Sequence, residues 1–205
     1  MSDAVRQLLC DGPGGGASAI LRGMDVPGAL EQVVTVLGEA QVQHALIGGL
    51  ALAAHGAGRA TQDIDFLVDG ARSSDVHSLM ERLGYRALHR SENAANYASD
   101  ANERGRVDFL FALRPYAKAM LARAESQRLF PSDPLEVRVV DAADLIGLKV
   151  QSSSNDASRH RIDMADIVRL LRGGGDVDMQ RVREYFRLFE REKELDGLLG
   201  ELGLS

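Results

Sequence analysis

The sequence of 205 residues is long enough for one domain with a helical extension, and 45% hydrophobic with 26% charged residues is an ordinary globular composition. Its net charge of -6 argues against a protein that coats nucleic acid through bulk positive charge and leaves room only for a local basic groove. A single cysteine, Cys10, allows no intramolecular disulfide and excludes a zinc site built on cysteines. The sequence has neither an apolar run of about 18 residues nor a basic-then-apolar leader, so we expect a cytoplasmic protein without membrane contact.

Predicted helices and strands alternate over the first 140 residues, after a linker-like start. Residues 1–24 contain Asp-Gly-Pro-Gly-Gly-Gly at 11–16, which is typical of a flexible linker. These glycines do not indicate a phosphate-cradling loop, because no strand precedes them and no Gly-Lys-Ser/Thr follows. Hydrophobic periodicity and turn residues predict helices over 27–41, 75–83 and 115–127 and strands over 45–47, 63–68, 85–89, 106–111 and 135–140. The polar segment over 91–102 is expected to form a turn and an irregular strand.

The last third of the sequence is predicted to be helical. Pro131 and Pro134 precede the strand over 135–140, which suits an edge strand because proline cannot donate a ladder hydrogen bond. Asp141 is a suitable N-cap for the helix that follows. The helices are expected over 141–151, 156–172, 178–190 and 191–199. The pattern predicts an α/β fold with a mixed-sheet core over 25–140 and a helical region over 141–205.

Acidic residues interrupt two of the apolar strands. Asp63 and Asp65 lie two residues apart in Asp-Ile-Asp-Phe-Leu-Val, so a strand places both on the same face. Asp108 lies within Val-Asp-Phe-Leu-Phe. Buried carboxylates are uncommon unless they are paired or bound to a cation. If the two strands are neighbours, the three acids supply the oxygen ligands that two Mg²⁺ ions and a nucleoside triphosphate require.

A glycine pair, Gly48-Gly49, separates the strand over 45–47 from a short Ala/Leu-rich segment. Glycines at such a position let backbone N–H groups approach a phosphate, and a helix N-terminus favours an anion. Tight turns use the same pair, so the glycines alone do not distinguish a turn from a phosphate site.

Taken together, these motifs resemble the DNA polymerase beta-like nucleotidyltransferase superfamily. The sequence motif Ile-Gly-Gly-x-Ala-x-x-x-His-Gly, followed by Arg-x-Thr-x-Asp-Ile-Asp, is most similar to the minimal branch that includes AbiEii-type toxins. The resemblance covers about residues 46–110. It departs from many minimal members in the longer gap between the glycine pair and Asp63, which leaves the role of the loop over 55–59 open.

The resemblance implies the polymerase beta-like fold and a division of roles among the motif residues. Asp63 and Asp65 would hold two Mg²⁺ ions, and Asp108 would complete the metal site and help to deprotonate the acceptor. Gly48 and Gly49 would cradle the β- and γ-phosphates of the nucleoside triphosphate.

Residues between the two motifs are further candidates for nucleotide contacts. Arg59 precedes the acids and could meet a phosphate. Thr61 is a candidate contact as well, although it also fits as the cap of a turn. His55 fits the end of a helix as a cap at least as well as it fits a nucleotide contact.

A second group of candidates lies in the helical region. Lys149, followed by Arg161-Ile-Asp163 and Asp166, is similar to the Lys…Arg-x-Asp-x-x-Asp helices of AbiEii-type proteins. Asp163 and Asp166 are three residues apart and share a helix face. Lys149 would reach a nucleotide phosphate; alternatively, these side chains form structural ion pairs that tie two helices together. Ile162 stands where many family members have a lysine, so one phosphate contact is absent.

The expected function is Mg²⁺-dependent transfer of a nucleoside monophosphate from a nucleoside triphosphate to an acceptor hydroxyl, with release of pyrophosphate. The acceptor could be a tRNA end, a protein hydroxyl or a small molecule. The alternative is a catalytically silent nucleotide-binding or interaction module from a toxin–antitoxin pair, with a cognate antitoxin as its partner. A metal phosphohydrolase is disfavoured because the five histidines lack ligand spacing.

Overall fold

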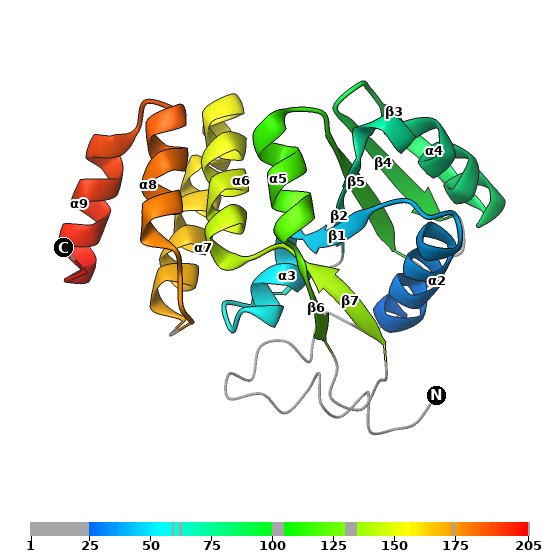
Figure 1. Ribbon diagram of the computed structural model, residues 1–205, viewed down its shortest axis with the longest axis horizontal. Helices are drawn as coiled ribbons and strands as arrows, with labels where there is room; N and C mark the ends of the chain where they lie inside the picture. Colours follow the sequence, from blue (N-terminus) through cyan, green and yellow to red (C-terminus); the bar gives the residue numbers. More distant parts are fainter. Residues whose placement is uncertain are drawn as a thin grey trace. The chain divides into compact units, whose positions relative to one another are not determined.

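The computed structural model describes residues 25–58, 60–61, 63–99, 105–129, 135–173 and 175–204. The chain forms two compact units (Figure 1). The core unit contains the residues up to Ala54 together with Gly58–Val140, and the helical unit contains His55–Ala57 together with Asp141–Ser205. None of the helices in the described part of the chain is both long and apolar enough to cross a membrane.

A seven-stranded mixed sheet organises the core unit, with strand order β3-β4-β5-β2-β1-β7-β6. β2 lies in the middle, parallel to β5 and antiparallel to β1. Among the described residues, four α-helices of the same unit and one 3₁₀ turn flank the sheet. The strands are β1 (His44–Ile47), β2 (Asp63–Asp69), β3 (Tyr85–Arg90), β4 (Ala94–Ser99), β5 (Arg106–Ala112), β6 (Glu125–Arg128) and β7 (Glu136–Val139); the helices are α2 (Val26–Glu39), α3 (Gly48–Ala54), η2 (Gly70–Arg72), α4 (Ser73–Arg82) and α5 (Pro115–Arg123).

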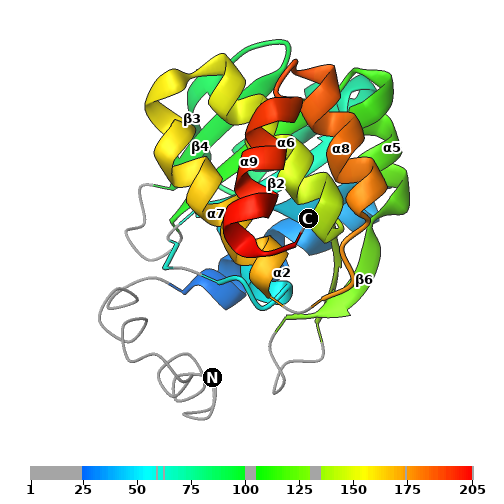
Figure 2. The same cartoon turned by 90° about the vertical axis from the view of Figure 1, so that its left-hand side faces the viewer.

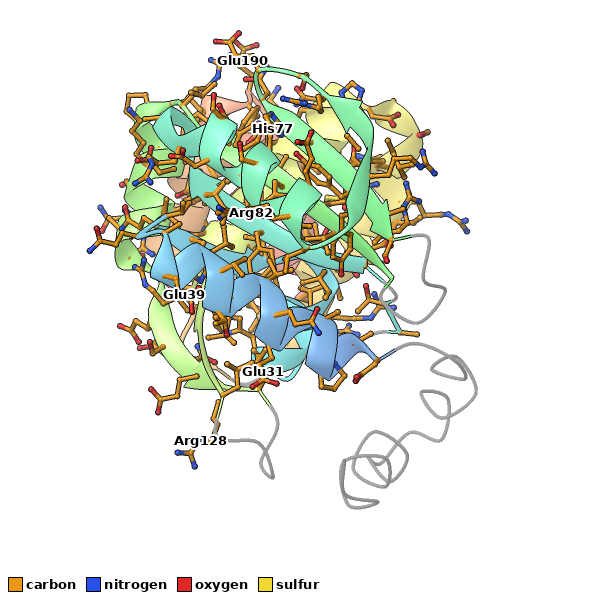
Figure 3. All side chains as sticks on the ribbon, turned by 90° about the vertical axis from the view of Figure 1, so that its right-hand side faces the viewer. Glu31, Glu39, His77, Arg82, Arg128 and Glu190 are labelled. Atoms are coloured by element: carbon orange, nitrogen blue, oxygen red, sulfur yellow. The ribbon has the colours of Figure 1, made fainter. Side chains whose placement is uncertain are left out.

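One face of the sheet is closed by apolar packing. Phe66 of β2 stacks on Phe109 of β5, and Tyr97 of β4 meets Phe109 edge-on. His77 of α4 packs against Tyr97 and Phe111. Figure 3 shows α2 and α4 lying over this face, where buried Leu30 and Val33 of α2 and Val76 and Met80 of α4 complete the core. Because strand residues alternate, the acids of β2 and β5 point to the opposite face.

Hydrophobic stripes hold the helices of the helical unit together. Its elements are α6 (Ala142–Asn155), η3 (Ala157–Arg159), α7 (His160–Arg172), α8 (Met179–Leu188) and α9 (Glu192–Leu202). Figure 2 shows α6, α7, α8 and α9 packed side by side. Asp141 caps α6 by accepting a 2.8 Å bond from the Asp144 backbone N–H, as predicted. Tyr185 of α8 donates a 2.6 Å bond to the buried Asp144 and lies flat against Gly147, where a side chain would collide with its ring.

The α/β fold class with a mixed sheet is confirmed, and three local expectations are corrected. The helix predicted to end at Gln127 ends at Arg123, because Ala124 turns to ψ 135° and the chain continues as β6. The strand expected over 91–102 is present as β4, but it is regular and not irregular where it pairs with β5. The strand over 136–139 is not an edge, because β6 folds back to pair with it; Pro131 and Pro134, on which the edge prediction depended, lie outside the described residues.

Candidate active site

Two acidic residues stand side by side at the centre of the sheet. Asp65 of β2 is in direct register with Asp108 of β5, so both side chains point to the same face. Neighbouring strands lie about 4.8 Å apart, which brings the two carboxylates close together. Asp63 shares that face two residues earlier on β2, about 6.6 Å along the strand. The expected neighbourhood of the two acid-bearing strands is therefore present.

The surroundings of Asp108 disfavour its charged form. Its Oδ1 atom is buried and has no hydrogen-bond partner. Burial raises the pKa of the Asp108 carboxyl, a side-chain hydrogen bond from Asn96 opposes that rise, and the Asp63 carboxylate adds to it. Arg106, two residues earlier, acts to lower the same pKa. A cation near Asp108 would compensate this buried oxygen without a donor and the charges of the two neighbouring acids.

The glycine pair is shaped to fit the acids. Gly48 has φ +66°, a conformation that glycine adopts without cost. A Cβ atom on Gly48 would lie 2.7 Å from Cβ of Asp65 and closer still to its carboxylate. The backbone of the turn after β1 and the Asp65 side chain are therefore in direct contact.

Thr61 holds the second glycine from the other side. A Cβ atom on Gly49 would lie 2.6 Å from Cβ and 2.7 Å from Oγ1 of Thr61. The Thr61 hydroxyl also accepts a 3.4 Å bond from the Asp63 N–H and donates a 3.3 Å bond to the Asp63 carbonyl. Thr61 is thus the cap of the turn into β2, and a contact with a nucleotide stays a prediction.

The donor set suits Mg²⁺ by chemistry. Three carboxylates on one face of the sheet offer hard oxygen ligands, and Asp108 Oδ1 is an acceptor without a donor. In the part of the chain that the structure describes, no three His, Cys, Asp or Glu side chains approach closely enough to form a metal cluster by themselves. The residues fit the ion as partial ligands, and Mg²⁺ commonly takes its remaining ligands from water and substrate phosphates.

A buried ion cluster ties two helices of the helical unit together. Lys149 of α6 is only 7% exposed, and its Nζ lies 2.8 Å from Asp166 and 3.2 Å from Asp163, both on α7. Arg159 and Arg169 bind the outer oxygens of the same two carboxylates at 3.4 and 2.9 Å. The structure therefore contains the ion pairs expected if these side chains tie α6 to α7. A contact between Lys149 and a nucleotide phosphate stays a prediction.

The loop between the two motifs divides between the units. Arg59 lies outside the described residues. His55 belongs to the helical unit, where its carbonyl oxygen lies so near Gly173 that a Cβ there would be 3.2 Å away. A contact between His55 and a nucleotide remains a prediction.

Sequence reasoning missed two residues beside the acids. Asn96 is in register with Asp108 on the β4 side, and Arg106 is in register with Asp63. The signal for Asn96 was the alternation of Ala-Ala-Asn-Tyr-Ala-Ser, which the polar surroundings of this segment concealed. The sequence pattern identifies Arg106 only as the first residue of a strand.

The motifs also connect the chain to known proteins. Residues 33–202 match the family described as nucleotidyl transferase AbiEii toxin of a type IV toxin–antitoxin system. That span includes the glycine pair, the three acids and the ion cluster around Lys149. No curated protein is similar enough to this chain to count as a relative.

Solved structures with the same fold share little sequence with the chain. The solution structure of the antibiotic-resistance factor ANT(2'')-Ia superimposes with a TM-score of 0.58 at 14% identity, over 83% of this chain and 94% of that one. Its crystal structure in complex with adenylyl-2''-tobramycin gives 0.57 at 15% identity, over 80% and 95%. An antigenic nucleotidyltransferase-like protein from Paracoccidioides brasiliensis gives 0.51 at 14% identity, over 87% and 94%. At these identities the likeness establishes the fold.

Proposed function

The chain belongs to the AbiEii family of nucleotidyl transferases, and we propose that it transfers a nucleoside monophosphate from a nucleoside triphosphate to an acceptor hydroxyl, with Mg²⁺ and with release of pyrophosphate. The acceptor oxygen forms a bond to the α-phosphorus, and the bond from that phosphorus to the oxygen bridging to the β-phosphate breaks. The electron pair of the broken bond leaves with pyrophosphate. The hydroxyl proton passes to a carboxylate of the site.

The observation that carries this proposal is the pairing of Asp65 with Asp108 beside the Gly48 turn. Asp63 and Asp65 would hold two Mg²⁺ ions, with Asp108 as a further ligand. Bound there, Mg²⁺ supplies positive charge to the triphosphate and to the leaving pyrophosphate. Asp108, whose pKa is raised chiefly by burial, is the best placed carboxyl to accept the proton of the acceptor hydroxyl.

Gly48 and Gly49 would bind the β- and γ-phosphates through backbone N–H groups at the start of α3. The absence of a Cβ at both positions leaves room for the side chains of Asp65 and Thr61 beside the turn. Arg59 and Thr61 are proposed to add contacts to the same phosphates, as a guanidinium and a hydroxyl can.

Lys149, with Asp163 and Asp166, is proposed as a second contact with the nucleotide. Lys149 carries the charge, and Asp163 and Asp166 fix its position from α7. Because these carboxylates already neutralise the ammonium, the structural contribution of the cluster to α6–α7 packing is the part that its distances support most directly.

The alternative of a silent interaction module is not favoured, because the acids and glycines of the motif are all present. The family description places this chain in a toxin–antitoxin context, and we propose a cognate antitoxin as its regulator. A tRNA end, a protein hydroxyl or a small molecule is proposed as the acceptor.

Incubation with Mg²⁺, each labelled nucleoside triphosphate and cell extract tests the proposal. Labelled product should form with the wild type and fall roughly a hundredfold or more in Asp65→Asn. Glu31→Gln, an exposed residue of α2 labelled in Figure 3, is the matched control and should retain transfer. Equal label transfer by Asp65→Asn and Glu31→Gln would show that the acids do not support the reaction.

A further inference from the structure

Strands β3, β4 and β5 carry an excess of positive charge in an acidic protein. The chain has a net charge of -6, yet these three strands contain a single acid, Asp108. Against it stand three arginines, Arg86, Arg90 and Arg106, and one histidine, His89. The charge of Arg90 is partly balanced by Glu81 of α4, 3.9 Å away.

Two of these arginines lie on the face of the sheet that bears the acids. Arg106 is in register with Asp63 of β2 on one side and with Ala98 of β4 on the other. Arg86 of β3 is in register with the same Ala98. Registered neighbours share a face, so two guanidiniums flank a small residue about two strand spacings, or roughly 10 Å, apart.

The Arg106 side chain begins β5 beside the acids. It is exposed, and among the described residues no hydrogen bond or ion pair of its guanidinium is found. Its charge is nevertheless close enough to act on the pKa of Asp108. An arginine at the border of an acid site that forms no ion pair with a described carboxylate can also bind an incoming anion.

The side of the acids on which Arg106 lies indicates whether that anion belongs to the nucleotide donor or to the acceptor. β1, which leads into Gly48, lies on one side of β2, and β5, which carries Arg106, lies on the other. In phosphoryl transfer the attacking and leaving oxygens are roughly in line. If the Gly48 turn holds the phosphates that leave, the acceptor approaches from the side of β5 and β4.

We propose that Arg106 is a specificity-determining residue that binds a phosphate of the acceptor, next to the hydroxyl that is modified. This inference rests on the proposed function. It assigns an anionic acceptor to the site, and it disfavours polycationic acceptors, which like charge would repel. Arg86 extends the same basic row by one strand.

Binding of three defined probes tests the inference without need of turnover. The first is a fluorescent RNA hexamer with a phosphodiester backbone, the second is the same hexamer with an uncharged methylphosphonate backbone, and the third is adenosine 5′-monophosphate. The wild type should prefer the charged hexamer over the uncharged one. Arg106→Gln should weaken binding of the charged hexamer roughly three- to tenfold and reduce the salt slope by about one. Arg106→Lys should restore most of the loss.

Arg128→Gln is the control for loss of one surface charge. Arg128 is exposed and lies on β6, at the other edge of the same sheet (Figure 3). Weaker binding of adenosine 5′-monophosphate to Arg106→Gln would identify a mononucleotide as the anion, and an effect on the hexamer alone would identify a polynucleotide. Equal binding of the two hexamers, or equal effects of Arg106→Gln and Arg128→Gln, would overturn the inference.

Thermal unfolding with ATP and Mg²⁺ separates this inference from the proposed function. The ATP-induced shift should be the same in wild type and Arg106→Gln, because the donor lies on the other side of the acids. A smaller shift in Arg106→Gln would assign the arginine to the donor and overturn the inference. Absence of any ATP or other triphosphate shift in the wild type would instead count against the proposed function.

Discussion

The Asp65 carboxylate occupies the space that a side chain on Gly48 would need. A Cβ there would lie 2.7 Å from Cβ of Asp65, and Gly48 has a φ of +66°. The turn after β1 and the acid on β2 thus constrain each other, which couples the expected phosphate site to the expected metal site. A substitution in the turn should therefore disturb the acids as well.

Gly48→Ala tests this coupling. The positive φ costs about 1 kcal/mol for alanine, and the collision with Asp65 adds to that cost, so we expect a loss of about 2 kcal/mol in unfolding free energy. Nucleotide transfer should fall roughly a hundredfold because Asp65 must move. Gly38→Ala is the matched control: Gly38 lies in α2 with nothing within 4 Å of an added Cβ, and the change should stabilise by about 0.5–1 kcal/mol. Urea unfolding and a transfer assay measure both. Wild-type behaviour of Gly48→Ala would refute the coupling.

Asp108→Asn should separate stability from activity. Burial and the neighbouring Asp63 raise the pKa of Asp108, so at neutral pH its charged form costs folding free energy. The amide has the same shape without the charge. We expect unfolding free energy to rise by about 1 kcal/mol or less, while transfer and the Mg²⁺-induced thermal shift decline. A variant less stable than wild type would show that the Asp108 charge is compensated within the fold.

Lys149→Met tests whether the ion cluster is structural. The change leaves Asp163 and Asp166, both fully buried, without their shared ammonium, and loss of one partner of a buried pair costs about 3–5 kcal/mol. Neutralising both acids as well, in Lys149→Met/Asp163→Asn/Asp166→Asn, should recover most of that stability. Arg159→Gln removes a half-exposed partner and should cost less than about 1 kcal/mol.

The same variants distinguish the two roles considered for Lys149. If Lys149→Met unfolds at the wild-type urea concentration but loses the triphosphate-induced thermal shift, the lysine serves the nucleotide. If stability falls and is restored by the triple variant, the cluster serves the packing of α6 on α7. Circular dichroism of each variant shows whether the helices have formed.

The sequence was sufficient for the strongly patterned parts of the fold. The apolar strand over 63–68 and the strand over 106–111 were predicted because β-branched and aromatic residues surround the acids, and β2 and β5 follow them closely. The Asp141 cap was predictable because its bond to Asp144 is local. Nonlocal features were harder: β4 pairs with β5 through backbone groups that composition does not reveal, so its polar sequence predicts only an irregular strand.

The residues of the candidate site also differ in how far the sequence alone could identify them. The acids and the glycine turn were identified because their chemistry is rare in apolar segments. Arg106 and Asn96 became candidates only when strand register placed them beside Asp63 and Asp108. The end of α5 was misplaced because helix propensity continues through Glu125 and Gln127, and pairing of β6 with β7 overrides it.

His44 should make the stability of the fold depend on pH. It lies on β1 next to the ring of Phe66, and its Nδ1 donates a 2.8 Å bond to the Val42 carbonyl. Burial lowers the pKa of His44 below its ordinary value of 6.5; the bond to Val42 opposes the shift, and the charge of Arg138 adds to it. Folded His44 is therefore neutral where the unfolded residue is already protonated.

The sign of the pH effect follows from this difference. Between pH 6.5 and the lower folded pKa the unfolded state binds more protons, so unfolding free energy falls as the pH falls. The contribution of His44 is complete above pH 6.5 and declines through the folded pKa. His44→Asn, which keeps a donor for the Val42 carbonyl, should reduce the slope of unfolding free energy against pH in this window. Urea titrations from pH 5 to 8 measure both slopes, and His89→Asn is the exposed histidine control. Identical slopes for wild type and His44→Asn would show that His44 is protonated without cost to the fold.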